Sequence, residues 1–70
     1  MQATIAIVNP QNGRMTDYTF AQLRKDAAHA VKGKGRLEHF WVEFVEGGNA
    51  TLVAQYQESS GWCASMRIAI

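Results

Sequence analysis

Cys63 and His39 are the two side chains that could supply nucleophilic chemistry, as a thiolate and its general base. Alternation predicts both on the outer face of a sheet, with a third strand between theirs, which separates them by about 10 Å. No third residue is placed to orient the histidine, and a 70-residue chain with one helix offers little enclosed volume. We therefore predict that the protein is not an enzyme and has no catalytic residues. Cys63 is expected to be a small packing residue beside Trp62.

A metal site is not expected either. His39 and Glu43 lie two residues to either side of Trp41, and His29 falls on a predicted helix elsewhere in the chain. Two histidines and a single cysteine do not complete the four-ligand set of a structural zinc site. We expect no bound metal and no cofactor.

Recognition through an exposed sheet face is a second kind of chemistry. His39, Trp41 and Arg67 are predicted on the face that a single helix leaves uncovered. Tryptophan beside arginine is typical of interface hot spots and could equally stack on a base, or the tryptophan is half-buried beneath a loop or a second copy. RNA-binding sheets present two or three aromatic side chains, and this face has one, which weakens the nucleic-acid interpretation. The other residues expected on this face are Glu43, Thr51, Val53, Gln55 and Ser65.

Charge is strongly segregated along the chain, although the formal net charge is only +1. Five of the seven lysines and arginines fall within residues 24–36, where Asp26 is the single acid, whereas residues 37–66 carry four glutamates and no lysine or arginine. Such a segment attracts phosphates or acidic protein surfaces, or is simply a solvated helix face and loop. Its Lys-Gly-Lys-Gly-Arg run lacks the spacing of a Walker phosphate loop. The residues predicted to bind a partner are Arg24, Lys25, His29, Lys32, Lys34 and Arg36.

Local patterns place these residues on one helix and five strands. Thr19 and Gln22 fit a capping box at the start of a helix predicted over residues 20–32, which ends before Gly33. Short β-branched or alternating segments, separated by turn residues, predict the strands. The strands are expected at residues 4–8, 14–18, 37–45, 51–57 and 62–70, and the alternation is poorest at 14–18.

This order predicts an α+β fold, ββαβββ, or βαβββ if residues 14–18 do not form a strand. The helix is expected to pack on one face of a mostly antiparallel sheet. The apolar residues that should meet in the core are Phe20, Leu23, Ala27, Ala30 and Val31 on the helix, and Phe40, Val42, Phe44, Leu52, Ala54, Tyr56, Trp62, Ala64, Met66, Ile68 and Ile70 on the last three strands.

Length and composition limit the class of protein. Seventy residues predict a single domain over residues 1–70 with a thin core, as a monomer or weak homodimer. A hydrophobic fraction of 47% with 19% charged residues is typical of a folded soluble domain. No apolar run approaches the about 20 residues of a membrane span. Residues 1–4 lack the start of a signal peptide, and the lone cysteine cannot form an internal disulfide, so we expect a cytoplasmic protein without a membrane partner.

The order of hairpin, capped helix and three-stranded meander resembles that of small phage-encoded anti-CRISPR proteins that inhibit the type I-F surveillance complex. The helix start, residues 19–27, is similar to that family's hydroxyl, apolar and small residues followed by glutamine, a basic pair and alanine. The later segments 40–45 and 61–63 follow the family's order of strands, turns and tryptophan. The likeness covers roughly two-thirds of the chain, by pattern more than by identity.

The resemblance implies a protein of the host-cell cytoplasm that docks on the backbone subunits of the Cas surveillance complex and blocks pairing of target DNA with guide RNA. The family's basic pair corresponds to Arg24 and Lys25, whereas a family lysine falls at His29 and a family glutamine at Val31, so the contact set differs. A basic surface beside a nucleic-acid channel would also make non-specific contact with DNA. The alternative is a small nucleic-acid-binding module that uses residues 24–36 and the open sheet face.

Overall fold

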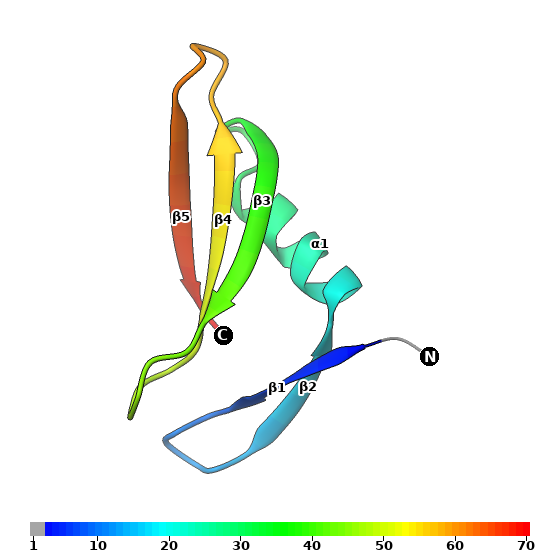
Figure 1. Cartoon of the computed structure of the whole chain (residues 1–70), viewed down its shortest axis with the longest axis vertical. Coiled ribbons are helices and arrows are strands. Elements are labelled where there is room, and N and C mark those ends of the chain that lie inside the picture. The colour runs from blue at the N-terminus through cyan, green and yellow to red at the C-terminus, as the bar shows by residue number, and fades with distance from the viewer. Residues whose placement is uncertain (1–2) are drawn as a thin grey trace.

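Five strands and one helix form in residues 3–70, the part of the chain that the structure, a computed structural model, describes (Figure 1). Their order, ββαβββ, confirms the predicted α+β fold, including the second strand. The strands form two antiparallel sheets, the hairpin β1-β2 and the meander β3-β4-β5, rather than one. Residues 1–2, part of the stretch assessed for a signal peptide, lie outside the described residues. The elements are β1 Thr4–Val8, β2 Met15–Thr19, α1 Phe20–Ala30, β3 Arg36–Glu43, β4 Thr51–Gln57 and β5 Cys63–Ala69.

Two asparagines close the turn of the β1-β2 hairpin. The side-chain oxygen of Asn9 accepts a hydrogen bond from the main-chain N–H of Gln11 at 2.9 Å, and that of Asn12 accepts one from Arg14 at 2.9 Å. Gly13 has a φ of +70°, a left-handed conformation that glycine adopts without strain. Because these local interactions fix the turn, β2 forms as a strand despite its poor alternation.

Helix α1 begins at a capping box and ends at a glycine turn. The Thr19 hydroxyl accepts a hydrogen bond from the N–H of Gln22 at 3.2 Å, and the Gln22 side chain accepts one from the N–H of Thr19 at 2.8 Å, as predicted. The helix ends at Ala30, earlier than expected, because the chain leaves the helical path at Val31 and turns at Gly33, where φ is +80°. Within residues 3–70, no helix has the length and apolar character of a membrane-spanning segment.

The connection from α1 to β3 packs tightly against the end of β4. A Cβ atom on Gly35 would overlap the carbonyl group of Gln57 and lie 2.9 Å from Cδ2 of Tyr56. The main-chain N–H groups of Lys34 and Gly35 both donate to the carbonyl oxygen of Val31, at 2.9 and 3.3 Å. The Lys-Gly-Lys-Gly-Arg run is therefore held in place by its own main chain and by β4.

The core lies between α1 and the central strand β4. Alanines on both elements are fully buried, which allows the helix axis to approach the sheet closely. Partly buried apolar side chains from the other strands surround this contact. The buried residues of this core are Leu23, Ala27 and Val31 on the helical side and Leu52, Ala54 and Tyr56 on β4.

Three aromatic residues expected in the core are exposed instead. Trp62 is 76% exposed and Phe44 is 64% exposed, because β5 begins at Cys63 and β3 ends at Glu43, so both rings lie in the loops beyond the strands. Phe20 is 55% exposed at the first position of α1. Periodicity therefore identified the correct faces of β3 and β5, but it predicted that these strands include Phe44 and Trp62, which lie beyond their ends.

The pairing of β3 with β4 is irregular at the start of β3. The register shifts between Leu37 and His39, as at a β-bulge. As a result Leu37 and Phe40 both pack against the core, although strict alternation would put residues three apart on opposite faces. Beyond the shift, pairing continues regularly to Glu43 opposite Thr51.

Replacing Leu23 by alanine should test the core directly. The change removes a fully buried side chain and leaves a cavity, so the free energy of unfolding should fall by about 3 kcal/mol. Urea denaturation followed by circular dichroism measures this loss. The control is Phe20→Ala, which removes an exposed ring and should change stability by less than about 1 kcal/mol. Equal losses in the two variants would contradict the placement of the core.

Candidate functional site

Arg67 and Trp41 both bind the Glu43 carboxylate on the outer face of the meander, the face turned away from α1. The Arg67 guanidinium donates Nη1 to Oε2 of Glu43 at 2.6 Å and Nη2 to Oε1 at 3.3 Å. The Trp41 indole N–H donates to Oε1 of the same carboxylate at 3.2 Å. The cluster therefore joins the two edge strands, β3 and β5, across β4.

This cluster covers the centre of a face that was expected to be open. Val53 lies in register between Trp41 on β3 and Arg67 on β5, and its side chain is 0% exposed. Since α1 lies on the other face, the side chains that bridge the strands are what exclude water from Val53. The expectation that Val53 lies on an open surface is therefore wrong.

His39, Trp41 and Arg67 do come together as predicted, but their arrangement is mainly internal. Trp41 is half-buried and its only polar group is bonded to Glu43, as is the Arg67 guanidinium. His39 is exposed, with its ring centroid 5.4 Å from that of Trp41 and the rings inclined by 36°. The indole is therefore partly buried, with its N–H group already bonded within the sheet.

The ion pair also shifts the ionisation of both partners. Hydrogen bonds from Arg67, and then from Trp41, lower the pKa of the Glu43 carboxyl below its ordinary value of 4.5. The same pair raises the pKa of Arg67. Because folding favours the charged carboxylate, Glu43 contributes stability above pH 4.5, and this contribution is lost as the pH falls through its lowered pKa.

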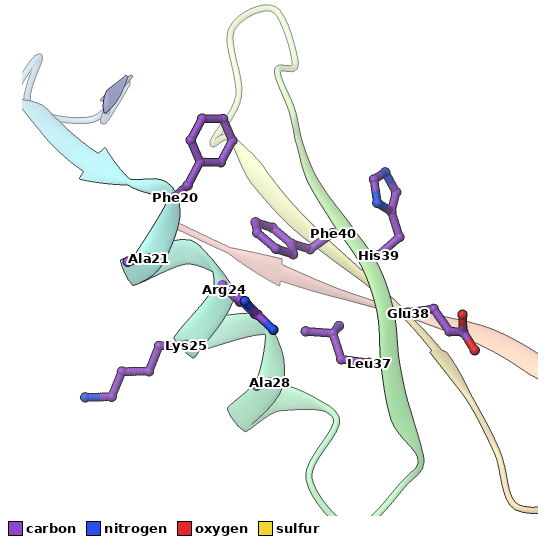
Figure 2. A pocket seen from close by; sticks show the side chains of 9 residues that line it. All are labelled: Phe20, Ala21, Arg24, Lys25, Ala28, Leu37, Glu38, His39 and Phe40. Carbon is purple, nitrogen blue, oxygen red and sulfur yellow. The ribbon is translucent and has the colours of Figure 1, made fainter. Parts of the chain in front are cut away.

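The six residues of the predicted basic site are distributed over two hollows and the loop that follows the helix. Arg24 and Lys25 line a groove between α1 and β3, although the Lys25 side chain points away from β3 (Figure 2). His29, one turn beyond Lys25 on the same helix face, lines a second hollow near the end of β5 together with Asp26. Arg36 binds Glu38 at 3.2 Å and the side-chain oxygen of Gln57 at 3.2 Å. Lys32 and Lys34 are exposed beyond the end of the helix.

Arg24 and Lys25 border a groove of about 710 Å³ between α1 and β3, here called the α1–β3 groove (Figure 2). Leu37 and Phe40 point from β3 toward the helix, and Phe20 adds an exposed ring at the helix start. The groove thus combines an apolar wall with Arg24 on its helical side, and Lys25 lies at its outer rim with its side chain directed away from β3. Its lining residues are Phe20, Ala21, Arg24, Lys25, Ala28, Leu37, Glu38, His39 and Phe40.

Sequence reasoning missed the apolar half of this groove. Phe20 was assigned to the core because it falls on an apolar stripe of the helix, but it is 55% exposed, whereas Phe40 packs against the core as expected and also lines the groove. An aromatic residue at the first helical position, one turn from an arginine and a lysine, was the available signal.

The residues considered for catalysis lie on separate strands. His39 pairs with Gln55 on one side of β4, and Cys63 pairs with Gln57 on the other, so β4 separates them as predicted. Cys63 is exposed, and its expected role as a packing residue is wrong. Among the described residues, no three histidine, cysteine or acidic side chains gather in a way that could hold a metal ion.

The pH dependence of stability should depend on Glu43. In the wild type, the thermal midpoint should fall as the pH is lowered from 6 through 4.5 to 3, because protonation of Glu43 breaks its bonds to Arg67. Glu43→Gln should have a lower midpoint at pH 6 and a flatter profile. The matched control, Glu46→Gln, changes an exposed neighbour and should retain the wild-type profile. Identical profiles for Glu43→Gln and the wild type would exclude the stabilising role of this cluster.

Comparison with known proteins does not place this chain in a family. No family model, curated protein or solved structure matches it. Its function must be argued from the α1–β3 groove and the charges around it.

Proposed function

We propose that this protein is a non-enzymatic binding module that docks through the α1–β3 groove on an acidic protein surface, and so acts as an inhibitor or adaptor. One observation carries the proposal. Arg24 and Lys25 border an apolar groove that contains an aromatic ring, Phe20, which is 55% exposed. Aromatic and arginine side chains around an apolar centre with a charged rim are typical of protein interfaces.

The charges of the groove favour an acidic partner. Within residues 3–70 the ion pairs are Arg36–Glu38 and Arg67–Glu43, so Arg24 and Lys25 pair with no acid there. Glu38 also lines the groove, but its carboxylate is bonded to Arg36. Two cations without internal partners therefore remain to meet negative charge on a partner.

Direct binding of nucleic acid has less support. Contact with a phosphate backbone is strengthened by several unpaired cations on one continuous surface, whereas here Arg36 is paired with Glu38 and Asp26 lies beside His29. Trp41, the proposed stacking residue, is half-buried and bonded to Glu43.

The resemblance to anti-CRISPR proteins supplies one specific candidate for the partner. In that case Arg24 and Lys25 dock on the backbone subunits of a type I-F surveillance complex and prevent its binding of target DNA. The groove would then require an acidic surface on those subunits. The protein would act in the cytoplasm of the host cell.

Charge reversal separates the groove from the remaining basic residues. Arg24→Glu combined with Lys25→Glu should weaken inhibition of target-DNA binding by a purified type I-F surveillance complex by roughly 30-fold, equivalent to about 2 kcal/mol. A gel shift with labelled target DNA measures this. Lys32→Glu combined with Lys34→Glu carries the same change in charge outside the groove and should inhibit as the wild type does. Both pairs are exposed, so the thermal midpoint should change little.

Two results would contradict the proposal in different ways. Absence of inhibition by the wild type would remove the surveillance complex as the partner. Equal loss in both double variants would show that general positive charge, rather than the groove, is responsible. A direct titration with duplex DNA completes the test, because tight binding that falls steeply with salt would favour the nucleic-acid module instead.

A further inference from the structure

Strand β3 has an unpaired edge. The order of the meander is β3-β4-β5, so within residues 3–70 β3 pairs with β4 alone and its other edge has no strand beside it. The N–H and C=O groups along such an edge are available to pair with another extended chain. Within residues 3–70 the outer edge of β5 is also unpaired. The groove lies beside β3, so the edge of β3 is the candidate binding edge.

The α1–β3 groove opens along the edge of β3. Figure 2 shows the side chains of Glu38 and His39 pointing away from the helix, yet both residues line the groove. They therefore contribute the main chain of the strand to its wall. Leu37 and Phe40 contribute side chains, so the groove presents main-chain hydrogen-bonding groups and apolar surface together.

The usual protection of an edge strand is absent from most of β3. Proteins commonly shield such edges with lysine, proline or a bulge. The register shift between Leu37 and His39 disturbs only the beginning of β3, and the regular segment 40–43 contains neither lysine nor proline. Its one charged side chain, Glu43, is bonded to Arg67 on the outer face.

We propose that the occupant of the α1–β3 groove is an extended acidic segment of a partner protein, which adds to the edge of β3 as a fourth strand. The inference rests on the proposed function and specifies how the partner binds. Alternate side chains of the added strand enter the groove, where apolar ones pack on Phe20 and Phe40 and acidic ones meet Arg24, while Lys25 at the outer rim adds positive charge. The intervening side chains lie beside His39 on the outer face.

Charge favours this occupant over a second copy of the chain. Two copies joined edge to edge through β3 would bring two pairs of Arg24 and Lys25 toward one junction, where like charges repel. The β5 edge is a poorer site for an acidic segment, because the hollow beside the end of that strand contains Asp26.

Selection from a displayed library of random 12-residue peptides tests the chemistry of the occupant. Peptides enriched on the wild type should carry acidic and apolar residues at spacings of i, i+2 and i+4, the period of a strand. Arg24→Glu with Lys25→Glu should reduce their affinity at least tenfold, whereas Lys32→Glu with Lys34→Glu should leave it within twofold. Enrichment at i, i+3 and i+4 spacing would indicate a helical ligand and overturn strand addition.

Hydrogen exchange tests the geometry. With an enriched synthetic peptide bound, the amides within residues 39–43 that do not bond to β4 should exchange at least tenfold more slowly, as measured by NMR. Methylating alternate main-chain nitrogens of the peptide, those that face β3, should reduce its affinity at least tenfold, and methylating the others should have little effect.

The outcomes separate this inference from the proposed function. Peptide binding that requires Arg24 and Lys25 but leaves these amides unprotected would overturn strand addition and retain the groove as a docking site. Failure to enrich any peptide, or enrichment of peptides insensitive to both double variants, would contradict both. If the amides at the edge of β3 are already protected from exchange in the free protein, and this protection increases with protein concentration, a second copy of the chain is the occupant.

Discussion

Burial of strand β4 on both faces is the constraint on which the rest of this structure depends. Leu52 and Ala54 lie beneath α1, while Val53 between them points the other way and is equally buried. A chain with one helix can cover only one face of a sheet with that helix. The second face is closed by the bonds of Glu43 to Arg67 and Trp41, so a polar cluster performs a role that a second helix has in larger domains.

The way in which the two faces of the meander are covered determines where a binding surface remains. Because the outer face is closed at its centre, its tryptophan and arginine are largely committed to the fold. Because α1 crosses behind the meander, the space beside β3 remains as a groove with Phe20 exposed, Arg24 on its helical side and Lys25 at its outer rim (Figures 1 and 2). The candidate site is therefore a consequence of having one helix cover a three-stranded sheet.

Local patterns in the sequence predicted the elements well and their ends less well. The capping box of Thr19 and Gln22 fixed the start of the helix, and alternation identified the faces of β4 and β5. Alternation does not show where pairing stops, so Phe44 and Trp62 were assigned to the core although they lie in loops. The three-stranded meander was predicted correctly, but local patterns did not show that β1 and β2 form a separate sheet or that the register shifts between Leu37 and His39.

Only the charged half of the candidate site could be predicted from the sequence, because local patterns do not show how far one element extends past another. Arg24 and Lys25 were identified from charge, but His29, one turn beyond Lys25, lines a second hollow that contains Asp26. The apolar half of the groove depends on how far α1 extends past the sheet, which no spacing within the helix records.

Hydroxyl-radical footprinting of the aromatic side chains is the most direct test of the α1–β3 groove as the binding surface. Phe20, Phe44 and Trp62 are all more than half exposed in the free protein and should be oxidised readily. With a peptide selected for binding to the wild type, oxidation of Phe20 should fall several-fold while that of Phe44 and Trp62 stays unchanged. Protection of Phe44 or Trp62 with Phe20 unaffected would contradict the account, because the partner would then bind elsewhere.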